Sequence, residues 1–282
     1  MLNNYIMAGV MGWPVSHSRS PVIHNHWINQ YKLTGSYGLF PVKPENLEKA
    51  VRGLQALGLA GCNITIPHKV NALKFVDWAD PLAVRIGAIN TVVAQPNGEL
   101  HGFNNDGFGY IESLREVRTN WQGSDGTAVV IGAGGAARAI IVSLMDQGCN
   151  EIRLFNRTLS TAKELAQEFG PAVSAYKWEE RHSALAGTAL VVNTTNQGMN
   201  SQPALDINLS ELPQSALVSD AIYTPLETTF LAAARLRGNQ TVNGLGMLLH
   251  QARPAFKSWY GVMPEVTEEL RNSVIRTLSN TS

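Results

Sequence analysis

The chain has 282 residues, 44% of them hydrophobic and 16% charged, a length that suggests about two domains at roughly 150 residues per domain. Lysine and arginine number 22, as do aspartate and glutamate, so the formal net charge is zero. A balanced chain lacks the basic excess that attracts proteins to nucleic acids and anionic membranes. We therefore expect neither of these as a partner.

The two cysteines give no sign of a metal site or a disulfide framework. Cys62 and Cys149 lie far apart, and neither belongs to a CxxC pair or a Cys/His cluster, the arrangements typical of zinc sites and redox motifs. Residues 1–13 lack the basic segment of a signal peptide, and no run approaches the roughly 20 apolar residues of a membrane span. We expect a soluble cytoplasmic protein with two reduced thiols and no metal.

Short runs rich in β-branched residues alternate with helical patterns along the whole chain, which is typical of βαβ units on a mostly parallel sheet. Near the start, Ser20 is placed to cap a helix that has Pro21 at its first position. Asn97 and Gly98 separate two apolar runs and predict the turn of a hairpin. The other elements expected in this part are strands at 5–12, 37–42 and 62–66, a helix opened by Pro44 and Glu45, and hairpin strands at 88–94 and 99–103.

The residue pattern changes after about residue 120, where a compact apolar strand is followed at once by a glycine-rich turn and a helix of small residues. The strands expected in this part are 127–131, 151–155, 189–193 and 217–221, followed by helices from 246 onward with a break at 261–264. These patterns predict two α/β domains, with the C-terminal helices returning to the first.

The glycine-rich turn is the strongest single motif. Gly132, Ala133, Gly134, Gly135 and Ala136 follow the apolar Val129-Val130-Ile131 directly. Glycine permits the tight turn and the close approach of backbone N–H groups to a pyrophosphate, which the helix N-terminus also attracts. The alternative is a plain glycine-rich turn between a strand and a helix.

The end of the next strand bears on the choice of dinucleotide. An NAD-binding protein usually has Asp or Glu there to bind the ribose 2′-hydroxyl, whereas this chain has Asn156, Arg157 and Thr158. A guanidinium beside hydroxyl and amide donors suits a 2′-phosphate. We therefore favour NADP over NAD, the alternative being that Arg157 is a solvated surface residue.

Polar residues interrupt the first domain where a plain core would not have them. Hydroxyl and N–H groups of residues 16–21 could converge on an anion such as a carboxylate, and Asn63 and Thr65 share one strand face just before Lys69. Further polar groups stand at 90–91 and 104–107, on either side of the hairpin. Each segment alone could be a turn or a solvated surface, so the combination carries the argument.

Taken together with the nucleotide turn, these segments resemble the shikimate dehydrogenase family over nearly the whole chain. The matching motifs, in order, are SHSRSP at 16–21, NITIPHK at 63–69, GAINTV at 87–92, FNNDG at 103–107, GAGGAAR at 132–138, NRT at 156–158, VVNTTNQGM at 191–199, DAIYTPLET at 220–228 and GLGMLLHQ at 244–251.

The resemblance implies an α/β protein of two domains with the active site in the cleft between them. An N-terminal substrate-binding α/β domain with a mostly parallel sheet would span 1–104, completed by helices from 244–282, and a Rossmann-type NADP-binding domain would span 105–243. The implied reaction is the reversible NADPH-dependent reduction of 3-dehydroshikimate to shikimate in aromatic amino-acid biosynthesis. The substrate would be this small molecule, and the protein a monomer or a homodimer.

The resemblance also implies roles for individual residues. The substrate carboxylate would be held by Ser18, Ser20 and Tyr223, and the ring hydroxyls and the reacting oxygen by Asn63, Thr65, Asn90, Asp106 and Gln251. The cofactor would contact Gly132, Ala133, Gly134, Gly135, Ala136, Asn156, Arg157, Thr158, Thr161, Ala221 and Gly244. Lys69 would be the catalytic group, because hydride delivery to a ketone leaves charge on an oxygen that needs a proton, and Asp106 would be its partner.

Two positions depart from the usual family pattern. Asn105 stands where a threonine usually precedes the aspartate, a change that could alter substrate preference. Thr161 stands where many NADP-using members have a second basic residue, which leaves Arg157 as the main phosphate contact, with Lys163 as a possible helper. The alternatives left open are a dual-specificity quinate/shikimate dehydrogenase, a paralogue acting on a shikimate analogue, and a binding protein that has lost catalysis.

Overall fold

The computed structural model describes residues 5–278, and the chain divides into two compact units. Unit 1 comprises the chain up to Asn105 together with the segment from Gln251 onward, and unit 2 comprises Asp106–His250. The second boundary therefore falls inside helix α9 (Gly244–Tyr260), whereas the sequence-based boundary at 244 precedes that helix. Residues 1–4 and 279–282 of the expected first domain lie outside the described residues.

The sheet of unit 1 has six strands in the order β2-β1-β3-β5-β6-β4. Strand β1 runs parallel to β2 and to β3, while β5 is antiparallel to both β3 and β6. The antiparallel pairing of β5 with β6 confirms the predicted hairpin, and Gly98 has a φ of 95° in its turn. The strands are β1 (Ile6–Gly12), β2 (Gly35–Pro41), β3 (Gly61–Ile64), β4 (Trp78–Ala79), β5 (Thr91–Ala94) and β6 (Leu100–Phe103).

The helices of unit 1 lie between these strands and at the C-terminal end. The first helix begins at Ser20 with Pro21 in its first turn, but Arg19 and not Ser20 occupies the cap position. The Ser20 N–H instead donates to Ser18 Oγ at 3.3 Å. The helices are α1 (Ser20–Gln30), α2 (Leu47–Arg52), α3 (Lys69–Ala72), α4 (Pro81–Ile86), the C-terminal part of α9, and α10 (Glu268–Leu278), with short 3-10 turns at Pro44–Asn46 and Leu73–Phe75.

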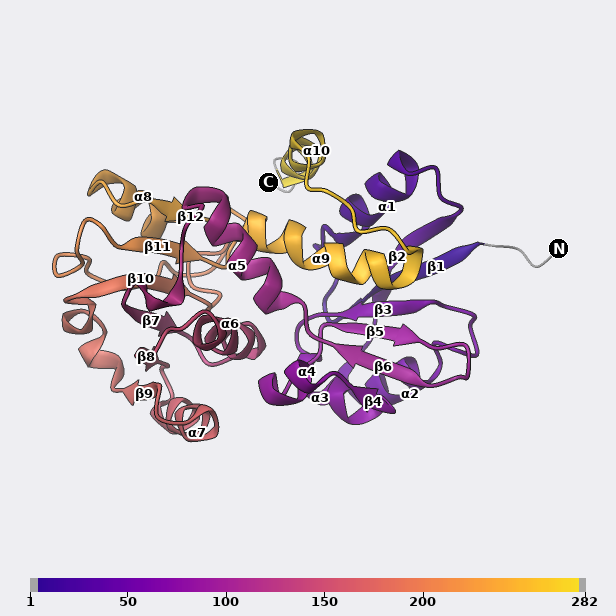
Figure 1. Cartoon of the computed structure of the whole chain (residues 1–282), viewed down its shortest axis with the longest axis horizontal. Coiled ribbons are helices and arrows are strands. Elements are labelled where there is room, and N and C mark those ends of the chain that lie inside the picture. Colours follow the sequence, from indigo (N-terminus) through magenta and orange to yellow (C-terminus); the bar gives the residue numbers. More distant parts are fainter. Residues whose placement is uncertain (1–4, 279–282) are drawn as a thin grey trace. The chain divides into compact units, whose positions relative to one another are not determined.

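The two faces of this sheet are covered differently (Figure 1). On one face, Cys62, Ile64 and Val92 pack against apolar residues of α2. On the other, Tyr37 of β2 contacts aromatic residues of α1 and α9, including Trp259. Because side chains alternate along a strand, Asn63 and Thr91 face away from the cluster that contains Cys62 and Val92.

The sheet of unit 2 is fully parallel, with the order β12-β11-β10-β7-β8-β9. This order is the doubly wound arrangement of dinucleotide-binding folds, and it confirms the predicted Rossmann-type architecture. The strands are β7 (Thr127–Ile131), β8 (Ile152–Phe155), β9 (Val173–Tyr176), β10 (Thr188–Asn193), β11 (Leu217–Asp220) and β12 (Thr241–Val242). The helices are α5 (Asp106–Val117), α6 (Gly135–Asp146), α7 (Leu159–Phe169), α8 (Thr229–Leu236) and the start of α9, with 3-10 turns at Gly123–Asp125, Trp178–Arg181 and Ser183–Leu185.

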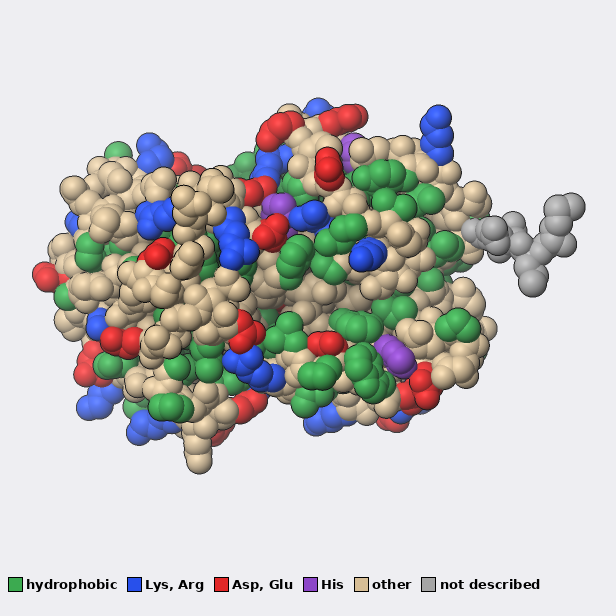
Figure 2. Space-filling model, in the orientation of Figure 1, with side chains coloured by type: hydrophobic (Ala, Val, Ile, Leu, Met, Phe, Trp, Pro, Cys, Tyr) green, Lys and Arg blue, Asp and Glu red, His purple; other side chains and the backbone are tan. Residues whose placement is uncertain are grey.

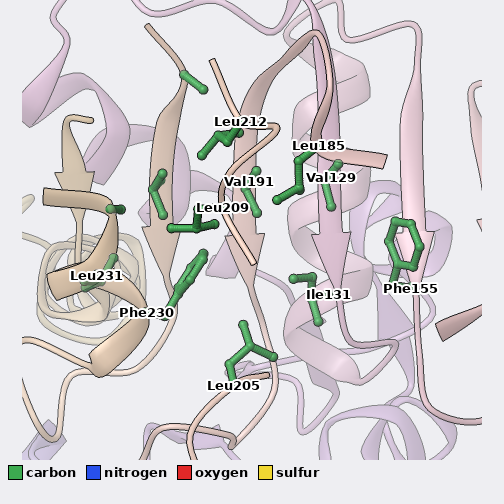
Figure 3. Packing of buried hydrophobic residues seen from close by; sticks show 13 residues of the cluster. Val129, Ile131, Phe155, Leu185, Val191, Leu205, Leu209, Leu212, Phe230 and Leu231 are labelled. Carbon is green, nitrogen blue, oxygen red and sulfur yellow. The ribbon is translucent and has the colours of Figure 1, made fainter. Parts of the chain in front are cut away.

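Strand β7 is apolar on both sides, as expected of a central strand covered on both faces. Val129 and Ile131 project into one cluster with Val191, Phe155 and residues of helix α8 and the loop before β11 (Figure 3). The intervening residue, Val130, is equally buried. Successive residues of β7 are therefore buried on both faces of the sheet, and the glycine turn follows directly at Gly132.

The surface carries charges of both signs. Figure 2 shows lysine and arginine side chains interspersed with aspartate and glutamate on the face in view. Within residues 5–278, the helices are all too short or too polar to cross a membrane. Both cysteines are buried free thiols, as expected from their spacing.

Candidate active site

The carboxyl ends of the parallel strands of unit 2 meet at one edge of the sheet, where ligands bind in folds of this type. The backbone loops that leave this edge are tied to one another. Gly132 N–H, after β7, donates to Phe155 O of β8 at 2.7 Å, and Thr194 N–H, after β10, donates to Ile131 O at 2.8 Å. Ala221 N–H, after β11, donates to Asn193 O at 2.9 Å.

Gly132 and Gly134 of the predicted nucleotide turn are glycines for different structural reasons. Gly132 has a φ of +110°, and a Cβ there would lie 2.4 Å from Thr194 Oγ1, so the fold itself requires glycine. A Cβ at Gly134 would meet no atom of the described residues within 4 Å. Packing therefore does not explain Gly134, and the open space above it fits the close approach of a pyrophosphate.

Helix α6 begins directly after this turn, at Gly135, and over the described residues no side chain caps it. Its first N–H groups and the partial positive charge of the helix end favour an anion at this place. Gly132, Ala133, Gly134, Gly135 and Ala136 thus form a continuous backbone cradle around the helix start.

The segment after β8 presents donors and a cation but no carboxylate. Asn156 Nδ2 donates to Thr158 O at 3.0 Å, which shapes the turn. Arg157, Thr158, Thr161 and Lys163 are exposed, so their side chains are accessible to a ligand phosphate. This arrangement fits the 2′-phosphate of NADP better than a bare ribose hydroxyl.

Sequence reasoning gave no role to Asp220 and Asn193, whose hydrogen bonds connect the ends of β10 and β11 at this edge. Asp220 Oδ1 accepts from Ile222 N–H at 3.0 Å and from Asn193 Nδ2 at 3.1 Å, while Oδ2 accepts from Thr228 Oγ1 at 2.8 Å. Burial raises the pKa of the Asp220 carboxyl to about 6, against the opposing effect of these hydrogen bonds. The signal available in the sequence was that each of these two apolar strands ends in a polar residue.

Gly244 is fixed by close approach to the same edge. A Cβ at Gly244 would lie 2.1 Å from Ala221 O, and its N–H donates to Ile222 O at 2.8 Å. The start of α9 is therefore held against the loop after β11, and the predicted cofactor residues Ala221 and Gly244 are neighbours. Tyr223, also in this loop, is partly exposed.

In unit 1 the predicted polar residues also gather at one sheet edge. Strands β1 and β3 end there, and β5, which is antiparallel to β3, begins there. Ser18 Oγ and Ser20 Oγ lie 3.3 Å apart at the start of α1. Thr65 N–H donates to Met11 O at 2.9 Å, which fixes the loop between β3 and Lys69, the partly exposed first residue of α3.

Three predicted substrate residues, Asn63, Asn90 and Gln251, form one hydrogen-bonded group. Asn63 Nδ2 donates to Asn90 O at 3.0 Å, and Asn90 Nδ2 donates to Gln251 Oε1 at 3.1 Å. Asn63 Oδ1 accepts from the Tyr37 hydroxyl at 2.6 Å. Burial raises the pKa of Tyr37 well above its usual value, so the phenol stays a neutral donor.

The structure thus gathers the predicted residues into two sets, one in each unit. Unit 1 holds Ser18, Ser20, Asn63, Thr65, Lys69, Asn90 and Gln251, and unit 2 holds the cofactor residues together with Tyr223 and Asp106, the buried first residue of α5. Within residues 5–278, no cluster of three or more His, Cys, Asp or Glu side chains could hold a metal ion.

Family models match both units. The model described as the shikimate dehydrogenase substrate binding domain matches residues 10–92, and the model described as shikimate / quinate 5-dehydrogenase matches residues 115–203. Among curated proteins, the shikimate dehydrogenase (NADP(+)) of Paramagnetospirillum magneticum is 49% identical over 269 residues, covering 95% of this chain and 98% of that protein.

Solved structures of related enzymes have the same fold. Shikimate 5-dehydrogenase from Thermus thermophilus, in complex with NADP(H) and shikimate, gives a TM-score of 0.85 at 34% identity, covering 96% of this chain and 99% of that one. Quinate dehydrogenase from Corynebacterium glutamicum, in complex with NAD, gives a TM-score of 0.89 at 28% identity, covering 97% and 100%. With near-complete coverage of relatives at this identity, the chain belongs to the shikimate dehydrogenase family.

Proposed function

We propose that the protein catalyses the reversible NADPH-dependent reduction of 3-dehydroshikimate to shikimate, a step of aromatic amino-acid biosynthesis. The observation that carries the proposal is the polar edge of unit 1, where Asn63, Asn90 and Gln251 are linked close to the loop that bears Lys69. A binding protein that had lost catalysis would have no reason to keep Lys69 and Asp106, and both are present.

The cofactor proposed is NADP. The pyrophosphate would lie on the backbone of residues 132–136, where Gly134 leaves open space, and the 2′-phosphate would contact Arg157, with Asn156, Thr158 and Thr161 beside it. Ala221 and Gly244 would line the same cofactor. When bound, NADPH supplies the hydride for the reduction.

Lys69 is proposed as the proton donor in reduction and the acceptor in oxidation. As hydride reaches the ketone carbon, the C=O π bond breaks and the oxygen takes a proton from Lys69 Nζ, which leaves an alcohol and a neutral amine. The amine then regains a proton from water. Asp106 is proposed to orient the ammonium and to bind the same hydroxyl, because a general acid has to lie within hydrogen-bond reach of the oxygen that it protonates.

The remaining residues are proposed to bind and orient the substrate. Ser18, Ser20 and Tyr223 would hold the carboxylate through hydroxyl donors, and Asn63, Thr65, Asn90 and Gln251 would bind the ring hydroxyls. Unit 1 is accordingly proposed as the substrate domain and unit 2 as the cofactor domain. Cytoplasmic location and a monomeric or homodimeric state stay predictions.

Initial rates of shikimate and quinate oxidation, each with NADP and with NAD, test the proposal. We expect strong preference for shikimate with NADP, followed by the absorbance of the reduced cofactor. The likeness to an NAD-bound quinate dehydrogenase supports a second candidate, a dual-specificity enzyme. Comparable rates with quinate or with NAD would favour that candidate, and no activity with any pair would overturn the substrate assignment.

A further inference from the structure

Thr91, which received no role from the sequence, lies at the centre of the polar group in unit 1. It is fully buried on β5, and its direct cross-strand partner on β3 is Asn63. Its hydroxyl lies 3.1 Å from Asn63 Nδ2, 3.0 Å from Asn105 Nδ2 and 2.8 Å from Asn90 Oδ1. A hydroxyl has one proton and two lone pairs, so these three contacts use its full capacity.

Two backbone groups fix the donor and acceptor directions of the hydrogen bonds around Thr91. The carbonyl of Asn90 faces the Asn63 carboxamide at 3.0 Å, and a carbonyl can only accept, so Nδ2 of Asn63 must point toward it. The N–H of Asn105 faces the Asn90 carboxamide at 3.0 Å, and an N–H can only donate, so Oδ1 of Asn90 must point toward it. Flipping the Asn63 carboxamide would bring two acceptors together, and flipping the Asn90 carboxamide would bring two donors together.

The orientation of the other side chains follows from these two anchors. Thr91 must donate its proton to Asn90 Oδ1, so its lone pairs must accept from Asn63 and Asn105. Asn90 Nδ2 then points away from Thr91 and donates to Gln251 Oε1 at 3.1 Å. The other branch of the Gln251 carboxamide is therefore its N–H₂ group.

We infer that Thr91 and Asn105 are positioning residues that fix the carboxamides of Asn90 and Gln251 so that both offer N–H donors to an oxygen of the substrate. This inference rests on the proposed function, since it assigns these amides to a hydroxylated or ketonic substrate. A ring hydroxyl or a carbonyl oxygen accepts such donors, and a site built on directed donors loses affinity when the direction is lost. Asn105 contributes twice, through its backbone N–H and through its side chain.

Substitution of Thr91 tests the inference through the separation of kinetic constants. Thr91→Val keeps the shape but removes the hydroxyl, and we expect KM for shikimate to rise about tenfold or more, with KM for NADP within about twofold of wild type. Thr91→Ser retains the hydroxyl and should recover most of the loss. The matched control is Thr188→Val, at a buried threonine of β10 in unit 2 whose hydroxyl donates to the backbone carbonyl of Ala184 at 3.3 Å. It should leave both KM values unchanged.

Asn105→Asp replaces the amide N–H₂ that donates to Thr91 Oγ1 with a carboxylate oxygen of nearly the same shape. Its carboxylate would compete with Asn90 Oδ1 for the Thr91 proton, so KM for shikimate should rise more than in Asn105→Ala, which only removes the contact. Equal KM values in Thr91→Val and wild type, or a serine variant no better than the valine variant, would overturn the inference while leaving the proposed function intact.

A measurement without substrate separates the two proposals. The side-chain amide protons of Asn63 and Asn90, assigned by NMR, should exchange slowly with water in the wild type and at least about tenfold faster in Thr91→Val. Fast exchange in the wild type would overturn the inference on its own. Wild-type protein that shows slow exchange but no shikimate oxidation would overturn the proposed function.

Discussion

Replacing the buried His24 by phenylalanine should remove a specific pH dependence of stability. The His24 side chain on α1 is completely buried, and within residues 5–278 neither ring nitrogen has a hydrogen-bond partner. Its ring stacks on Tyr37 with the centroids 4.1 Å apart and meets Trp27 edge-on at 5.8 Å. An aromatic hydrocarbon ring can keep these contacts without burying two unsatisfied polar groups, each of which costs about 1–3 kcal/mol.

The magnitude follows from the proton that the folded protein cannot bind. Burial lowers the pKa of His24 from 6.5 to about 3, so between these values the unfolded chain binds a proton and the folded chain does not. Stability is therefore fully present above pH 6.5 and is lost as the pH falls toward 3. At pH 5 the loss is about 2 kcal/mol, from about 1.5 pH units at about 1.4 kcal/mol each.

Urea unfolding of the wild type and His24→Phe at pH 7.5 and pH 5 checks this value. The change in packing is the same at both pH values and cancels in the difference, so the stability gap between variant and wild type should widen by about 2 kcal/mol at pH 5. His26→Phe, at a partly exposed position of the same helix, controls for loss of a histidine by itself. Gaps of equal size at the two pH values would refute the reasoning.

The other predictions concern the proposed site. Lys69→Ala should lower kcat by about 10²–10⁴-fold with NADPH binding nearly unchanged by fluorescence titration; parallel losses of turnover and binding would instead indicate a structural role. Arg157→Ala should raise KM for NADP about tenfold or more and leave KM for NAD little changed, because it removes charge-assisted hydrogen bonds to the 2′-phosphate; an equal change for both cofactors would rule out that contact. Gly134→Ala should keep the melting temperature but weaken NADP binding. Gly132→Ala should lower the melting temperature, because Gly132 has a φ of +110° and the new Cβ would lie 2.4 Å from Thr194 Oγ1. Similar melting temperatures for the two variants would contradict this distinction.

Much of the architecture is encoded locally and could be predicted from the sequence. Strand β7 is found over the predicted residues 127–131 because a short apolar run bounded by glycine has few alternatives. The hairpin around Asn97-Gly98 depends on turn chemistry within a few residues. The start of the first helix at Ser20 is marked locally by Pro21 in its first turn, although the predicted Ser20 cap is not formed. The predicted strand at 62–66 is shorter in the structure, ending at Ile64, and the two-residue strands β4 and β12 have no pattern long enough to detect.

The candidate residues divide in the same way. Glycine turns and polar residues at strand ends are visible in the sequence because they interrupt an apolar pattern, so Gly132, Asn63 and Lys69 could be selected without coordinates. The role inferred for Thr91 could not, since two of its three hydrogen-bond partners, Asn63 and Asn105, come from segments that only the fold brings next to it.

The sequence by itself therefore determined the order of the elements, the nucleotide turn and the family, because each depends on neighbouring residues or on motifs in register. The tertiary structure alone decided which nitrogen and which oxygen each carboxamide of the polar group presents. It also decided that His24 lies in an aromatic cluster with no hydrogen-bond partner among the residues that the structure describes. These properties depend on backbone groups and rings from distant segments, and burial makes them count because a misdirected or unpaired polar group is costly without water.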